Sequence, residues 1–278
     1  MKKKFNKEYI CLILSMILVS CGSNSEKQSE PSSDSETSKD IRPTEIVSDS
    51  EEQLEPSFDR ETSKNNHLAK IFSNMQEPLK IRLFRIFFPS FEVGSPITEQ
   101  MIVELTERKW INLSNGKLDT EAIKYLAPVL EKLTKLVSLD LGNNQLDTEA
   151  IKYLAPALEK LPQLERLRLY NNQLGTEAIK YLAPALGKLS NLESLNLINN
   201  QLDSEAMKYL APALGKLSNL ESLNLCRNQL DSEAMKSLAP ALEKLPQLES
   251  LNLSENQFDT EVIKSLAPAF WDYYLARF

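Results

Sequence analysis

The chain has 278 residues, a formal net charge of −7 and a single histidine. Its acidic balance argues against nucleic acid as a partner, because a phosphate backbone selects basic surfaces. The single histidine, His67, excludes a histidine-based catalytic triad and a metal site built from several histidines.

The first 20 residues have the features of a secretory signal. Four lysines stand among the first seven residues, and an apolar run of 11 residues follows at 9–19. Such a run is too short to span a bilayer, which takes roughly 20 residues. Residues 1–20 are therefore predicted to be a signal peptide.

The segment Leu18-Val19-Ser20-Cys21-Gly22 resembles the lipobox of bacterial lipoproteins. The resemblance implies that the Cys21 thiol receives a diacylglyceryl group, that the preceding peptide bond is cut and that the new amine is acylated. Acyl chains would hold the protein on a bilayer, since each buried CH₂ contributes about 0.8 kcal/mol. We therefore expect a lipid-anchored protein of the cell envelope. Gly22, in place of an inner-membrane retention aspartate, favours the outer membrane or the cell surface.

A polar spacer follows the expected lipidation site. Residues 22–66 are rich in Ser, Glu, Asp and Thr and contain few large apolar side chains. Such a segment cannot bury enough surface to offset its ordering entropy. We predict that 21–66 is a lipid-bearing, disordered acidic linker, with a root-mean-square reach of roughly 35–40 Å.

Two flanking segments have the composition of solenoid covers. Residues 67–107 are expected to form an N-terminal cap region, in which 79–88 is apolar with interspersed cations. That stretch is either a cap on the first repeat or an amphipathic element that contacts lipid. Residues 270–278 depart from the repeat and are predicted to be the C-terminal cap.

Between these covers the sequence repeats every 28 residues in the pattern L-x-x-L-x-L-x-x-N-x-L. A clear copy runs through Leu136, Leu139, Leu141, Asn144 and Leu146, and six registers keep the same spacing. The pattern resembles the leucine-rich-repeat family, most closely its ribonuclease-inhibitor-like subclass. The resemblance implies that residues 108–269 form an α/β leucine-rich-repeat solenoid, or horseshoe, with parallel strands on the concave face and helices on the convex face.

The second half of each repeat has helical spacing. In one copy, Ala150, Leu154 and Leu158 fall on one face, and Asp147 stands at the N-cap position. Gly175 replaces this aspartate in the third repeat. A proline recurs within every helix, so we expect each helix to kink or split there. A tyrosine column on the helix flank, at 125, 153, 181 and 209, is expected to be partly buried between neighbours.

One asparagine column is expected to be structural. A buried amide after each strand can bond the backbone of its turn, and stacked copies can satisfy one another's loops. The column consists of Asn144, Asn172, Asn200, Asn228 and Asn256.

A partner is expected on the concave strand face, where side chains are not used for packing. Most positions there are Ser or Asn, and a few depart from this pattern. Arg and Tyr are enriched at binding hot spots, which makes the departures a candidate partner-binding patch. The patch consists of Arg166, Arg168, Tyr170, Ile198, Cys226 and Arg227.

These observations favour a binding protein over an enzyme. No catalytic residue, metal ligand set, cofactor or small-molecule substrate is indicated, and Cys226 is the one thiol left after signal removal and lipidation. We expect a protein partner, with the bilayer contacted through acylated Cys21. Two alternatives remain open: a structural envelope component that self-assembles, or a secreted effector if Cys21 is not lipidated.

Overall fold

A computed structural model of the chain describes residues 60–75, 80, 83, 85, 87–88 and 98–259. The expected signal peptide, the lipidation site Cys21 and the C-terminal cap 270–278 lie outside these residues. So does the expected linker up to residue 59. Among the described residues, no helix is long and apolar enough to cross a membrane.

Six strands of three residues each form one parallel sheet in chain order. Trp110 lies opposite Ser138, which lies opposite Arg166, so each strand is displaced by one 28-residue period. This register confirms the predicted parallel sheet. The strands are β1 (Trp110–Asn112), β2 (Ser138–Asp140), β3 (Arg166–Arg168), β4 (Ser194–Asn196), β5 (Ser222–Asn224) and β6 (Ser250–Asn252).

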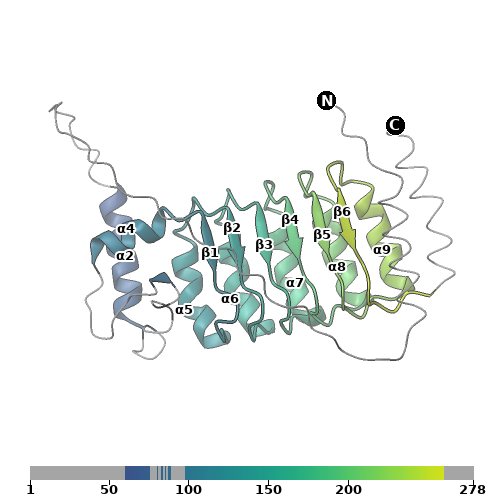
Figure 1. Cartoon of the computed structure of the whole chain (residues 1–278), viewed down its shortest axis with the longest axis horizontal. Helices are drawn as coiled ribbons and strands as arrows, with labels where there is room; N and C mark the ends of the chain where they lie inside the picture. The colour runs from purple at the N-terminus through teal and green to yellow at the C-terminus, as the bar shows by residue number, and fades with distance from the viewer. Residues whose placement is uncertain are drawn as a thin grey trace, which may run out of the picture.

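One helix follows each of the first five strands, and these helices cover one side of the sheet (Figure 1). Each repeat therefore contributes a strand to one layer and a helix to the other, which confirms the predicted α/β leucine-rich-repeat solenoid. The helices are α5 (Thr120–Leu130), α6 (Thr148–Leu158), α7 (Gly175–Leu186), α8 (Ser204–Leu214) and α9 (Ser232–Leu242).

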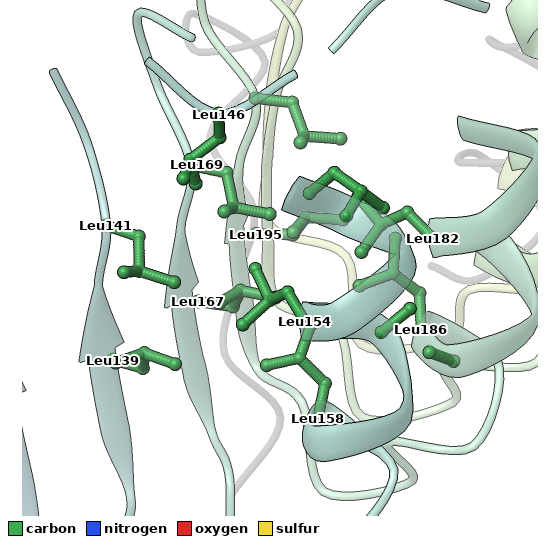
Figure 2. Packing of buried hydrophobic residues seen from close by; sticks show 14 of the residues in the cluster. Leu139, Leu141, Leu146, Leu154, Leu158, Leu167, Leu169, Leu182, Leu186 and Leu195 are labelled. Atoms are coloured by element: carbon green, nitrogen blue, oxygen red, sulfur yellow. The ribbon is translucent and has the colours of Figure 1, made fainter. Parts of the chain in front are cut away.

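The core lies between the sheet and the helices. Figure 2 shows Leu139 and Leu167 from the strands pointing toward Leu154 and Leu158 of α6, and all four side chains are fully buried. Full burial of a leucine contributes about 1.5–3 kcal/mol. One strand and one helix cannot enclose such a core alone, so each repeat depends on its neighbours.

The asparagine column binds the turns of adjacent repeats. Asn144 Oδ1 accepts from Leu118 N–H at 2.9 Å, and its Nδ2 donates to the carbonyls of Leu113 and Leu141 at 3.0 and 2.9 Å. Leu113 and Leu118 belong to the first repeat (108–135), whereas Asn144 belongs to the second (136–163). A single amide therefore satisfies buried backbone groups on both sides of a repeat junction.

The repeat proline lies inside a continuous helix in all five described helices of the repeats, whereas Pro268 lies outside the described residues. Pro128, for example, stands two residues before Leu130, the last residue of α5. Of the two expected outcomes, a kink or a split, the split is therefore wrong. A proline so near the end removes only one backbone hydrogen bond, and the apolar face that includes Leu126 and Leu130 packs the last turn against the core.

The N-terminal end of the sheet is covered by α2 (Arg60–Ser73) and α4 (Glu99–Thr106), at the left of Figure 1. α2 begins at Arg60, inside the segment that the sequence analysis assigns to the linker. From the ambiguous stretch 79–88, Leu83, Phe87 and Phe88 are buried in the same cluster as the repeats. These three side chains pack as a cap.

Candidate protein-binding surface

The first and third residues of each strand point away from the helices, on a surface that we call the strand face. In β1 and β3 the middle residue is buried and its two neighbours are exposed. Most strands carry serine first and asparagine third. These asparagines are not spare side chains: Asn196 Oδ1 accepts from Ile198 N–H at 3.1 Å and Asn224 Oδ1 from Cys226 N–H at 3.1 Å.

The same turn contact recurs at five of the six strands. Asn112 accepts from Ser114 N–H, Asp140 from Gly142 N–H and Asn252 from Ser254 N–H, at 2.9–3.0 Å. Such a contact is an Asx turn, in which a short polar side chain holds the backbone two residues ahead. The third position of a strand is therefore normally committed to the turn that follows it.

β3 departs from this rule because its third residue is Arg168. A guanidinium has no acceptor, so it cannot hold the turn. Its Nη1 instead lies 3.6 Å from Asp140 Oδ2 on β2, and the side chain is 49% exposed. Arg166, at the first position of β3, is 44% exposed and lies 3.7 Å from both Glu165 and Glu193. These distances are longer than hydrogen bonds. The two ion pairs of Arg166 are exposed and contribute about 0–1 kcal/mol, whereas Arg168 lies beside an Asp140 side chain that is only 10% exposed.

Tyr170 follows β3 and lies over Gly142 of the neighbouring repeat. A Cβ atom at Gly142 would stand only 2.1 Å from Tyr170 Cε1 and 2.3 Å from its Cζ. The ring thus occupies the space that any larger residue at 142 would fill. Tyr170 and Arg168 both lean toward β2.

Trp110 of β1 completes this half of the strand face. It is 68% exposed, the largest exposure among the big apolar side chains that the structure describes. It occupies the same column as Arg166, two strands away. Trp110 is not among the residues of the candidate patch that the sequence analysis names. The sequence could have indicated Trp110, because four of the six residues in its column are serine and a tryptophan departs from that pattern. We call Trp110, Arg166, Arg168 and Tyr170 the strand-face patch.

The other candidate residues lie further along the solenoid. Ile198 is half-buried after β4, on the far side of Tyr170 from Gly142. Cys226 is only 7% exposed, and its Sγ lies 3.2 Å from Ser254 Oγ. Its thiol is therefore largely shielded from a protein partner, and we leave Cys226 out of the strand-face patch.

Arg227 is engaged with the next repeat. Its Nε donates to Glu255 Oε2 at 2.8 Å, and this hydrogen bond raises the pKa of the guanidinium above its ordinary value. Arg227 and Glu255 have φ values of 57° and 53°, in the left-handed region that asparagine tolerates better. Asparagine does hold the equivalent positions 115, 143, 171 and 199. The side chains of Asn143, Asn171 and Asn199 are hydrogen-bonded in a row, and the Arg227–Glu255 ion pair takes the place of such a contact. It lies outside the strand-face patch.

The helix face carries a second aromatic column. Tyr153, Tyr181 and Tyr209 are 42%, 45% and 39% exposed, so their rings are only partly covered. Lys152 Nζ lies 5.1 Å from the centre of the Tyr181 ring while it also donates to Glu149. The hydrogen bond to Glu149 raises the pKa of Lys152. Lys180 lies over the Tyr209 ring in the same way, and these contacts between lysines and tyrosine rings join neighbouring helices.

Comparison with known proteins agrees with this architecture. A family model described as Leucine Rich repeat matches residues 132–155, 188–211 and 216–239, and a second leucine-rich-repeat model matches residues 247–269. The chain is a leucine-rich-repeat protein. Repeats of this kind typically serve protein–protein interaction. No curated protein matched the chain.

Solved structures similar to the chain include one bacterial protein and one nematode protein. An internalin C2 from Listeria monocytogenes is 22% identical, with a TM-score of 0.37, covering 72% of this chain and 92% of that one. The tropomodulin C-terminal domain from Caenorhabditis elegans is 18% identical, with a TM-score of 0.41, covering 57% of this chain and 95% of that one.

Proposed function

We propose that the protein is a lipid-anchored lipoprotein of the cell envelope that binds a protein partner through the strand-face patch. One observation carries the location of the binding surface. At β3 the chain gives up the Asx turn that the other five strands keep, and it places the exposed guanidinium of Arg168 there instead. Within the described part of the chain, the Arg168 side chain makes only the 3.6 Å ion pair with Asp140, and about half of it stays exposed for a contact outside the chain.

The chemistry of the patch supports a protein partner. Trp, Tyr and Arg dominate the binding energy of protein interfaces, since they combine a large contact area with directional hydrogen bonding. Here an exposed indole, a phenol and two guanidinium groups lie within three adjacent strands. The remaining strand face is mostly serine and asparagine, which is typical of the weakly contributing surroundings of a hot spot.

The anchor rests on the lipobox resemblance at Cys21. An acylated Cys21 followed by the polar stretch 22–59, which ends where α2 begins, would hold the repeats on a bilayer at a distance of roughly 30–37 Å, the reach of a flexible chain of that length. This arrangement favours the outer membrane or the cell surface, where the strand face can meet a partner. Metabolic labelling with a palmitate analogue tests it: the wild type should incorporate label and Cys21→Ala should not. Equal labelling of both would overturn the anchor.

Binding is tested by crosslinking capture on intact cells, followed by affinity measurement with the captured protein. We expect Trp110→Ser and Arg166→Ser, which install the serine of the other repeats, each to weaken binding at least tenfold. Arg227→Asn is the matched control, because it also installs the residue of other repeats but lies outside the patch. Full binding by both patch variants would overturn the proposal. Capture of the chain itself would favour self-assembly instead.

A further inference from the structure

Two reciprocal hydrogen bonds join the start of α5, α6, α8 and α9 to the repeat that follows. In the second repeat, Leu146 N–H donates to Asn172 Oδ1 at 3.1 Å, and Gln173 N–H donates back to the Leu146 carbonyl at 3.0 Å. The fourth repeat (192–219) does the same toward the fifth (220–247). Leu202 N–H donates to Asn228 Oδ1 at 3.0 Å, and the Leu202 carbonyl accepts from Gln229 N–H at 2.8 Å.

The junction between the third repeat (164–191) and the fourth lacks both bonds. The residues in the equivalent positions are Leu174, Asn200 and Gln201. Asn200 Oδ1 is the one buried side-chain polar atom without a partner in the part of the chain that the structure describes, and Asn200 is fully buried. Gln201 has a φ of 60°, in the left-handed region, and its N–H makes no hydrogen bond to the Leu174 carbonyl.

A different and smaller set of bonds forms at this junction. Gly175 N–H donates to the Asn200 carbonyl at 3.0 Å, and Asn200 N–H donates onward to Asn228 Oδ1 at 2.9 Å. The second of these serves the junction with the fifth repeat, not the one with the third. A buried amide oxygen left without a donor carries its full desolvation penalty.

The origin of the irregularity is Gly175, which stands where the other repeats have an aspartate. Asp147 and Asp203 are extended, both with φ of −108°, and each caps its helix through a hydrogen bond from the N–H three residues on. Gly175 has a φ of +55°, and Leu174 before it is already helical. The chain therefore enters α7 along a different path.

The same glycine also interrupts a second ladder, one junction earlier. Thr120 Oγ1 donates to Asp147 at 2.8 Å and Thr176 Oγ1 donates to Asp203 at 2.6 Å, each across a repeat junction. Gly175 has no carboxylate to accept from Thr148, so this bond is missing between the second and third repeats, whereas the junction between the third and fourth repeats keeps it. Packing does not demand the glycine, because a Cβ built there meets nothing within 4 Å.

We propose that the junction between the third and fourth repeats is a hinge, the place where the solenoid opens internally most readily. The stability of a solenoid is the sum of repeat contributions and nearest-neighbour contacts, so a junction that loses bonds opens first. The hinge divides the described repeats after β3. The strand-face patch then lies wholly on the N-terminal side, whereas β4, β5 and β6 move as the other unit.

Hydrogen exchange on the full-length chain, resolved by residue, tests the hinge. The amides of Leu174 and Gln201 should exchange at least tenfold faster than those of Leu146 and Gln173, after correction for intrinsic rates. In Gly175→Asp, whose side chain has room to restore the extended cap, both rates should fall to those of the equivalent residues. The midpoint of thermal unfolding should rise by about 3 °C.

Asp203→Gly is the matched control, since it should create the same irregularity one junction later and speed exchange at Leu202 and Gln229. Equal protection at all junctions of the wild type would overturn the proposal. Unchanged rates in Gly175→Asp would also overturn it, because the irregularity would then not originate at the glycine. The first of these results comes from the wild type and the second from a variant that keeps the core intact, so the test does not depend on the folding of Asp203→Gly.

Discussion

The third repeat (164–191) and the fourth (192–219) share one apolar framework and differ in their polar positions. Leu167 and Leu169 of one correspond to Leu195 and Leu197 of the other, and all four are buried. The differences fall at 166, 168 and 170 on the strand face, at 175 and 176 where the helix begins, and at 179, where one buried apolar side chain replaces another. The comparison shows that one repeat can carry most of the residues that depart from the repeat pattern, because the core positions alone maintain the stacking.

The largest expected loss of stability comes from replacing a buried asparagine, and it should differ between the third and fourth repeats. Asn172→Ala removes the acceptor of Leu146 N–H and the donor to three carbonyls, so we expect a loss of about 3 kcal/mol in the free energy of unfolding. Asn200→Ala should cost about half as much, since the Asn200 oxygen has no partner to lose. Urea unfolding followed by circular dichroism measures both. Equal losses would contradict the account of the third junction.

The loss of folding stability at low pH should come from the aspartates that cap the helices, which the third repeat lacks. The Ala150 N–H holds the pKa of Asp147 below its ordinary value of 3.8, and the Ser204 hydroxyl does so for Asp231. A native pKa below the unfolded one contributes stability that is present above pH 3.8 and is lost as the pH falls through the native value.

Asp147→Ala should therefore cost about 1 kcal/mol at pH 7, because the helix loses its N-cap, and less at pH 2, where the wild-type carboxyl is also protonated. Urea unfolding at the two pH values measures the difference. The same cost at both would show that ionisation of Asp147 does not stabilise the repeat.

A smaller effect should follow from Gly142→Ala. The new Cβ overlaps the Tyr170 ring, which can swing out because it belongs to a surface side chain. We expect the free energy of unfolding to fall by about 0.5 kcal/mol, and the near-ultraviolet signal of the tyrosine to change. An unchanged signal would mean that Tyr170 does not lie over Gly142 in solution.

Sequence alone predicts the sheet, the helices and the N-caps, because leucine spacing and aspartate position are local signals. It does not predict that Gly175 leaves Asn200 without a partner, since that effect passes through the backbone to residues 25 positions away. Nor does it predict that Cys226 is buried, because in the repeat pattern its position is as exposed as that of Tyr170. The continuity of the proline-containing helices depends on packing that a local propensity cannot include.

The strand-face patch was predictable only in part. Arg166, Arg168 and Tyr170 stand out as departures from serine and asparagine, and Trp110 does so in the same way. The meaning of Arg168 required the structure, which shows that the asparagine it replaces would hold the following turn.

Arg168→Asn tests the central claim most directly, because it separates stability from binding. The asparagine restores the Asx turn of the other strands, which should offset the loss of the 3.6 Å ion pair with Asp140, so the free energy of unfolding should stay about the same. Affinity for the captured partner should fall at least tenfold. A variant that is less stable, or one that binds as tightly as the wild type, would show that Arg168 serves the fold and not a partner.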